Sequence, residues 1–271
     1  RPPRSTLFPY TTLFRSLNVG INEEIAAGIA RQTGNPWFAW DNYRRFLQCY
    51  GMAFDLKRND FDEIMRRFKR EKGVLVKRGF SGEQMRELAL AYKKRILDEG
   101  IEVLEDPFAQ LLLTITKVLN SWESDKARIY RRIIGISDDW GTAVTVQSMV
   151  YGNISPSSGS GVFFTHNPKW SEDNLRLWGD FTIGNQGEDV VAGLVATLPI
   201  SIIQQENEMR DTDITLETHF PEIYQAILSW ANQLIYQKGW SPQEIEFTFE
   251  SPERRDLYIL QSRNMTMRER K

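Results

Sequence analysis

The sequence has little of the side-chain chemistry that many enzymes depend on. Its 271 residues include one cysteine, Cys49, and two histidines, His166 and His219. A single cysteine excludes a disulfide within the chain and fits a reducing compartment, which favours a cytoplasmic location. Cys49 follows an aromatic segment, so we interpret it as a packed side chain rather than a catalytic thiol.

An excess of one charge and long apolar runs are also missing. The net charge is −2, and no basic surplus or block of like charges occurs, so we expect no nucleic-acid partner. No apolar run reaches the length of a membrane span, and we expect no membrane partner. Hydrophobic residues make up 41% and charged residues 26%, which is typical of a globular protein.

Both ends of the sequence are unusual. The first methionine is Met52, and residues 1–16 contain three arginines and no acid. A transit peptide is one interpretation of that composition. Residues 8–16 resemble a translated sequencing adapter, so we favour a foreign or disordered leader at 1–16. We interpret residues 268–271 as a truncated tail and the whole as an internal fragment.

Residues 17–98 are predicted to form a helical subdomain. Asn22 is a candidate N-cap with two glutamates after it, and Ser81 with Gln84 forms a capping box. Between these helix starts, apolar residues recur at helical spacing at Phe61, Ile64, Met65 and Phe68.

Residues 99–267 mix helix and strand signals. Asp106 with Pro107 begins a helix, and Pro221 begins another. Strands are predicted over 142–150, 162–165 and 177–183, with a loop of small residues over 152–161. The expected fold class is therefore α+β: an antiparallel or mixed sheet with packed helices, preceded by the helical subdomain.

Two strands near the end of the sequence carry the most informative pattern. Ile245, Phe247 and Phe249 alternate with polar residues, so Glu244 and Glu246 share the opposite face, about 6.6 Å apart. In the second strand, Gln261 and Arg263 share a face by the same spacing.

If these strands pair antiparallel, a row of acids can face an amide and a guanidinium. Carboxylate and amide oxygens are ligands for Mg²⁺, and a guanidinium binds phosphate oxygens. The competing interpretation is a solvated strand face with a surface ion pair, and the spacing alone leaves both open.

Several longer motifs resemble one family. Thr-Gly-Asn-Pro and Tyr-Arg-Arg-Phe come first, then Asp-Trp-Gly-Thr-Ala-Val, Ser-Gly-Ser-Gly-Val-Phe-Phe-Thr and Asn-Gln-Gly-Glu-Asp-Val-Val-Ala-Gly, and finally Leu-Gln-Ser-Arg-Asn. In this order and spacing, over roughly residues 17–267, the sequence resembles the ATP-grasp nucleotide-binding domain of the pyruvate, phosphate dikinase family.

The resemblance implies residue roles. Glu246 and Gln261 would hold Mg²⁺, while Arg263 and Arg45 would hold ATP phosphates as the catalytic pair. From the residues alone, Arg45 is equally a surface residue and Met149 equally a core residue. Asp180 stands where the family usually has Glu, which shortens its reach. The remaining nucleotide contacts would be Gln147, Met149 and Val150 at the adenine, Gly159 and Gly161 in a phosphate-binding loop, and Asp180 and Glu188.

The resemblance also implies an activity for the parent protein. ATP, phosphate and pyruvate would become AMP, diphosphate and phosphoenolpyruvate, in a homodimer that adds a phosphohistidine domain and a pyruvate-binding barrel. Neither His166 nor His219 lies in the Thr-Ser-His-Ala type of motif that carries the phosphate, and the family's Gly-Gly-Lys-Gly segment is absent. We therefore expect weak Mg-ATP binding and no complete turnover from this chain alone.

Two alternatives remain at this stage. One is the same kind of domain from phosphoenolpyruvate synthase or another dikinase, such as a glucan-water dikinase. The other is a non-catalytic nucleotide-binding or interaction module that kept the fold.

Overall fold

The computed structural model describes residues 17–168, 174–187 and 195–265. The chain divides into two compact units, Arg1–Met149 and Val150–Lys271. This division falls later than the subdomain boundary predicted after residue 98, because the two helices that follow that point group with the N-terminal ones. A division by compactness is not a division by function, so the boundaries at 98 and 267 stay predictions. The predicted leader and tail lie outside the described residues.

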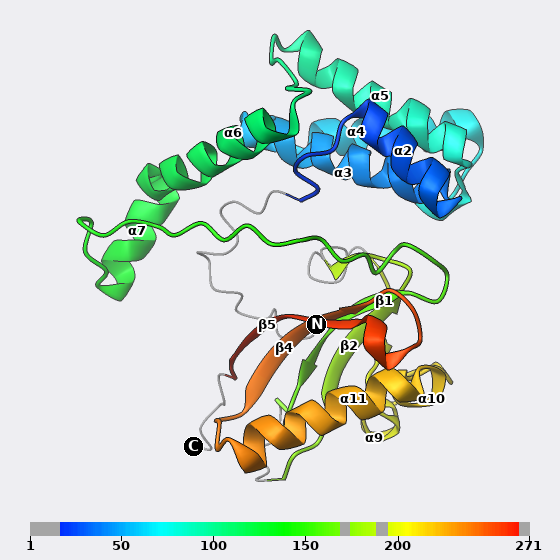
Figure 1. Cartoon of the computed structure of the whole chain (residues 1–271), viewed down its shortest axis with the longest axis vertical. Helices are drawn as coiled ribbons and strands as arrows, with labels where there is room; N and C mark the ends of the chain where they lie inside the picture. The colour runs from blue at the N-terminus through cyan, green and yellow to red at the C-terminus, as the bar shows by residue number, and fades with distance from the viewer. Residues whose placement is uncertain (1–16, 169–173, 188–194, 266–271) are drawn as a thin grey trace. The chain divides into compact units, whose positions relative to one another are not determined.

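The N-terminal unit is helical (Figure 1). It contains α2 (Glu23–Thr33), α3 (Pro36–Ala53), α4 (Arg58–Lys72), α5 (Gly82–Asp98), α6 (Pro107–Asn120) and α7 (Asp125–Ile134), with short 3-10 turns at Lys77–Gly79 and Ser121–Glu123. Three predicted helix starts are confirmed: Asn22 and Asp106 cap α2 and α6, and Ser81 forms its capping box with Gln84. None of the helices in the described ranges is long and apolar enough to cross a membrane.

The core of this unit lies between α3 and the helices around it. Tyr43, Phe46 and Leu47 of α3 are buried together with Met85 and Leu88 of α5. The apolar spacing predicted for α4 is confirmed, because Phe61, Ile64 and Phe68 are buried and Met65 packs against them.

A buried ion cluster sits within this helical core. Asp41 is fully buried and accepts hydrogen bonds from Arg44 Nε at 2.8 Å, Arg45 Nε at 3.0 Å and Lys77 Nζ at 2.9 Å. Arg44 and Arg45 are themselves 5% and 4% exposed. The interpretation of Arg45 as a surface residue is therefore wrong: its guanidinium helps to neutralise a carboxylate inside the helical unit.

The C-terminal unit is built on a five-stranded antiparallel sheet in the order β3-β2-β1-β4-β5. The strands are β1 (Gly159–Phe164), β2 (Trp178–Ile183), β3 (Leu198–Pro199), β4 (Gln243–Phe249) and β5 (Leu257–Asn264). The helices are α9 (Ile202–Glu208), α10 (Leu216–His219) and α11 (Pro221–Asn232), which continues into a π-helical turn at Gln233–Gln237; a 3-10 turn at Arg254–Asp256 precedes β5. The expected α+β class is confirmed.

The two faces of this sheet differ in chemistry. α11 runs across one face (Figure 1), which we call the apolar face, and its Ile223 and Ile227 belong to the same buried cluster as Phe163, Phe181 and Phe247. The alternation predicted for β4 is confirmed, since Ile245, Phe247 and Phe249 are 1% exposed or less. The opposite face, which we call the polar face, carries the charged residues of β2, β4 and β5.

Two predictions about this region are wrong. Residues 142–150 form no strand, and in the described chain none of them makes a hydrogen bond. The β-branched composition favoured a strand, but a strand exists only where a neighbour pairs its main chain. The loop predicted over 152–161 is shorter, because Gly159 and Gly161 lie inside β1.

Aromatic rings on β4 explain why β1 has glycine at positions 159 and 161. A Cβ atom on Gly159 would lie 2.5 Å from Phe249 Cζ, and one on Gly161 would lie 2.8 Å from Phe247 Cε1. Both residues therefore make room for aromatic packing on the apolar face. Their position in a strand corrects the predicted loop, and the phosphate-binding role of Gly159 and Gly161 stays a prediction.

Candidate functional site

The last two strands bring four predicted polar residues into two facing pairs. β4 and β5 pair antiparallel, with Glu246 opposite Gln261 and Glu244 opposite Arg263. Side chains directly opposite each other in an antiparallel pair lie on the same face, with Cβ atoms about 5 Å apart. The prediction that the acidic row faces an amide and a guanidinium across the two strands is confirmed. These four side chains lie on the polar face.

A β-bulge at Leu260 makes this arrangement possible. Phe247 faces Ile259, whereas Glu246 faces Gln261, so Leu260 is an extra residue in β5. One extra residue moves every later side chain to the other side of the strand. Without it, Gln261 and Arg263 would share the face of Phe247. No local signal predicts this bulge, because there is no glycine at this point and the two strands are equally regular in composition.

Arg263 is held in place by Glu244. An Nη2 hydrogen of Arg263 is donated to Glu244 Oε1, and the two side chains are 15% and 14% exposed. A charge-assisted bond in such a sheltered position fixes the guanidinium plane. Sequence reasoning placed Glu244 in the acidic row but gave it no role. The alternation of side chains in the two strands is compatible with the contact between Glu244 and Arg263, but it predicts that contact only once the register of the strands is known.

Glu246 and Gln261 suit a magnesium ion whose remaining ligands come from water and substrate. Both are half-buried, and they offer one carboxylate and one amide oxygen side by side. Within the described ranges no group of three or more His, Cys, Asp or Glu residues is arranged to hold a metal. Mg²⁺ is commonly bound through one or two protein oxygens together with water and substrate phosphates, so this small donor set suits it.

Asp180 extends the same row of side chains across the sheet. Val162 of β1 faces Asp180 of β2 on one side and Glu246 of β4 on the other. Asp180 therefore lies on the polar face, two strands from Glu246. Its Oδ1 accepts hydrogen bonds from Arg210 Nη2 at 2.8 Å and from Thr197 Oγ1 at 2.9 Å.

Three further predicted contacts lie at the end of the segment 142–150. Gln147 is exposed and Met149 half-buried in the unpaired segment 142–150, and Met149 belongs to neither hydrophobic cluster. Val150 is half-buried at the start of the C-terminal unit. Glu188 lies outside the described residues. The nucleotide roles of these residues, and that of Arg45, stay predictions.

The two histidines differ in how far water and a phosphate donor can reach them. His166 is 3% exposed, and its Nδ1 is hydrogen-bonded to Thr165 Oγ1 at 2.9 Å. His219 is exposed at the end of α10, with its ring against Phe220.

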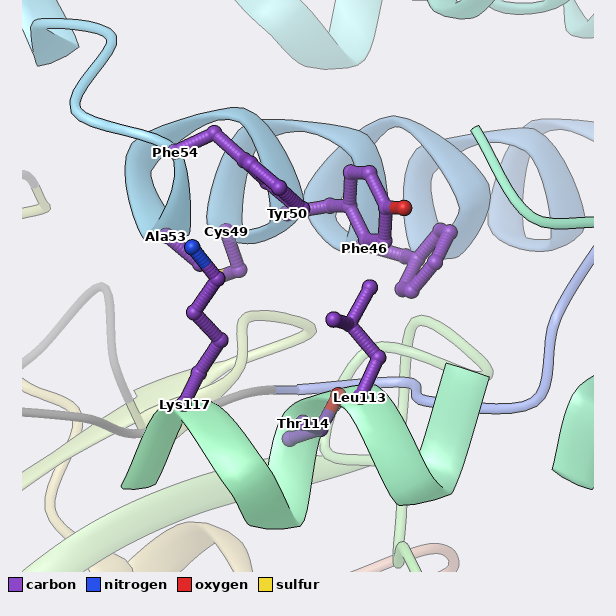
Figure 2. A pocket seen from close by; sticks show the side chains of 8 residues that line it. All are labelled: Phe46, Cys49, Tyr50, Ala53, Phe54, Leu113, Thr114 and Lys117. Carbon is purple, nitrogen blue, oxygen red and sulfur yellow. The ribbon is translucent and has the colours of Figure 1, made fainter. Parts of the chain in front are cut away.

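A small pocket in the N-terminal unit has different chemistry. Figure 2 shows side chains of α3 and α6 around it, including Phe46, Tyr50, Phe54, Leu113 and Lys117. Lys117 Nζ lies 3.9 Å from the centre of the Phe54 ring, which is a cation–π contact. The chain's one cysteine, Cys49, also lines the pocket. None of the predicted site residues does, and the lining has no carboxylate for a metal, so we do not assign the nucleotide to it.

Comparison with known proteins decides the family. Residues 75–223 match the family described as the pyruvate phosphate dikinase, AMP/ATP-binding domain. The chain belongs to this family. Curated relatives include pyruvate, phosphate dikinase from Clostridium symbiosum, 38% identical over 92% of the chain, and that from Rickettsia typhi, 34% identical over 91%. The chloroplastic pyruvate, phosphate dikinase 1 of Zea mays is 37% identical over 91% of the chain.

Membership of the pyruvate phosphate dikinase family confirms the resemblance inferred from the motifs. The named relatives are dikinases of this one kind, so phosphoenolpyruvate synthase and a non-catalytic module are not favoured. The chain covers 26%, 27% and 24% of these three relatives, so it spans about a quarter of their length.

Proposed function

We propose that the chain is the Mg-ATP-binding part of a pyruvate, phosphate dikinase. The parent protein converts ATP, phosphate and pyruvate into AMP, diphosphate and phosphoenolpyruvate, through a phosphohistidine on a domain outside this sequence. The observation that carries the proposal is the facing of Glu246 with Gln261 beside the Glu244–Arg263 pair on the polar face. An oxygen pair for a cation next to a fixed guanidinium is what a metal–polyphosphate needs.

Each residue has a distinct task in this proposal. Glu246 and Gln261 hold Mg²⁺, which neutralises phosphate charge when it is bound. Arg263 donates hydrogen bonds to phosphate oxygens, and Glu244 keeps its guanidinium aimed at them. Phosphoryl transfer relies on positioning and charge stabilisation more than on protein nucleophiles, so this set is sufficient for binding and orientation. The chain alone binds Mg-ATP weakly and completes no turnover.

Arg263→Ala tests the phosphate contact. We expect the affinity for Mg-ATP, measured by titration calorimetry, to fall about tenfold to hundredfold, because a hydrogen bond to a charged group contributes about 1.5–3 kcal/mol. Arg255→Ala is the matched control, since Arg255 is 77% exposed and its ion-pair partners among the described residues, Glu253 and Asp256, lie near its own turn. Unchanged binding in Arg263→Ala, or equal losses in both variants, would contradict the assignment.

Glu246→Gln tests the metal contact. ATP affinity is measured with Mg²⁺ and with the metal chelated away; we expect Mg²⁺ to strengthen binding by the native chain and to have little effect in the variant. The reason is that an amide keeps the shape of the side chain but removes the charge that attracts a hard cation. Glu253→Gln, at a 56% exposed side chain, is the control. A variant whose ATP affinity still rises fully with Mg²⁺ would place the metal elsewhere.

The wider setting belongs to the same proposal. We infer a cytoplasmic, homodimeric parent protein whose phosphohistidine domain and pyruvate-binding barrel act on the nucleotide bound here. The single half-buried cysteine supports a reducing compartment.

A further inference from the structure

A second charged arrangement on the polar face is formed by Arg210 and Asp180. Arg210 follows Met209, which ends α9 with a left-handed φ of 49°. From there the Arg210 side chain reaches β2, where Nη2 donates to Asp180 Oδ1 at 2.8 Å. Its Nε donates to Glu208 Oε2 at 2.9 Å, and Glu208 Oε1 in turn accepts from Trp178 Nε1 at 3.1 Å.

This arrangement is more rigid than an ordinary surface ion pair. The main-chain N–H of Arg210 is bonded to Gln205 O at 3.0 Å, and the side chain of Arg210 is 26% exposed. Thr197 Oγ1 donates to the same Asp180 oxygen at 2.9 Å. With two donors on Oδ1, the carboxylate plane is fixed, and Oδ2 is the oxygen left to accept bonds from a ligand.

The position of Asp180 relative to the metal pair is set by the sheet. The cross-strand row runs Gln261, Glu246, Val162 and Asp180. Neighbouring strands lie about 4.8 Å apart, so Asp180 and Glu246 are about 10 Å apart with an apolar side chain between them. A nucleotide whose phosphates lie at Glu246 and Arg263 can extend its sugar over Val162 toward Asp180.

We propose that Arg210 is a positioning residue that makes this site selective for ribonucleotides. It holds Asp180 so that the second carboxylate oxygen accepts hydrogen bonds from the hydroxyl groups of a ribose. A carboxylate suits this task because both vicinal hydroxyls can donate to it. The inference rests on the proposed function, since it assumes phosphates at the β4–β5 end of the row.

The experiment compares ATP with 2′-deoxy-ATP and 3′-deoxy-ATP, each with Mg²⁺, on the native chain and on Arg210→Ala. The native chain should bind ATP about tenfold to hundredfold more tightly than at least one deoxy analogue, as expected for a hydrogen bond to a charged acceptor. In Arg210→Ala that preference should fall toward equality because ATP binds more weakly while the deoxy analogue binds as before. A purely structural role would weaken all three nucleotides by the same factor.

Further variants keep the test decisive. Arg210→Lys should restore part of the preference, Thr197→Val should reduce it by removing the second donor on Asp180, and Arg255→Ala should leave it unchanged. If Arg210→Ala does not fold, Arg210→Lys and Thr197→Val carry the comparison. Equal binding of all three nucleotides by the native chain overturns the inference and leaves the proposed function standing. Absence of any Mg-ATP binding overturns both.

Discussion

Asp41→Asn is expected to lower the free energy of unfolding of the N-terminal unit by about 3–5 kcal/mol. The native carboxylate accepts bonds from Arg44, Arg45 and Lys77, and it is completely shielded from water. An amide of the same shape leaves those cations without their counter-charge, and an unpaired charge in a protein interior costs far more than the lost bonds themselves.

The measurement is denaturant unfolding followed by far-ultraviolet circular dichroism, which reports mainly on the helical unit. Asp62→Asn is the matched control, because Asp62 is 53% exposed and lies 4.0 Å from Arg58. A surface pair of that kind contributes less than about 1 kcal/mol. The two units need separate transitions in the fit, since chains of more than one unit do not unfold in a single step. Similar midpoints for the two variants would show that the ion cluster contributes little.

The same cluster gives a pH dependence of known sign. Burial by itself raises the pKa of Asp41, but the charges of Lys77, Arg44 and Arg45 outweigh it and hold the pKa well below its ordinary range. A carboxyl group whose pKa is lower in the folded state stabilises the fold at any pH above its unfolded pKa of about 3.9. That contribution is lost as the pH falls toward the folded pKa. The stability gap between the native chain and Asp41→Asn should therefore be full at neutral pH and shrink as the pH falls below about 4.

Gly179→Ala is expected to destabilise the C-terminal unit by about 3 kcal/mol or more. Gly179 is paired with Phe163 in the middle of the sheet, and its φ is +140°, a conformation that side-chain-bearing residues rarely adopt. A Cβ atom there would lie 2.1 Å from Val162 O and 2.8 Å from Phe163 Cα. Both atoms belong to the main chain of β1, so they cannot move aside without breaking the ladder between β1 and β2.

Gly239→Ala is the control that separates the backbone strain of a positive φ from a steric clash of the added Cβ atom. Gly239 also has a positive φ, +65°, but a Cβ atom there would meet no atom within 4 Å. Its substitution should cost only the conformational strain of about 1–2 kcal/mol. Hydrogen exchange of the β1 and β2 amides provides the measurement, with faster exchange expected in Gly179→Ala. Equal exchange in the two variants would mean that the sheet adjusts to the added methyl group.

Local signals predicted the helices and the strand faces well. Ser81 with Gln84 and Asp106 with Pro107 mark helix starts because a capping side chain and its partners lie within a few residues. The alternation of Ile245, Phe247 and Phe249 identified a buried strand face because this pattern, too, is contained within a few neighbouring residues. The segment 142–150 failed this approach because whether it becomes a strand depends on a partner strand distant in sequence.

The candidate site was predictable in its residue types but not in its assembly. Glu246, Gln261 and Arg263 stood out through their spacing and through the family motif. Their common face depends on the bulge at Leu260, and the anchoring of Asp180 depends on Arg210, thirty residues away in sequence. Arg45 could not be recognised as buried because its acidic partner, Asp41, is an ordinary helical residue until Lys77 is brought beside it by the fold.

The bulge in β5 also limits how this strand can evolve. Exchanging Leu260 for another side chain of similar size keeps the count of residues and therefore the orientation of everything after it. Losing a single codon there would preserve a regular hairpin while turning the amide of Gln261 and the guanidinium of Arg263 toward the hydrophobic interior. Within lineages of this fold, insertions and deletions in the strand should accordingly be rarer than replacements, because the number of residues decides which face the later side chains occupy.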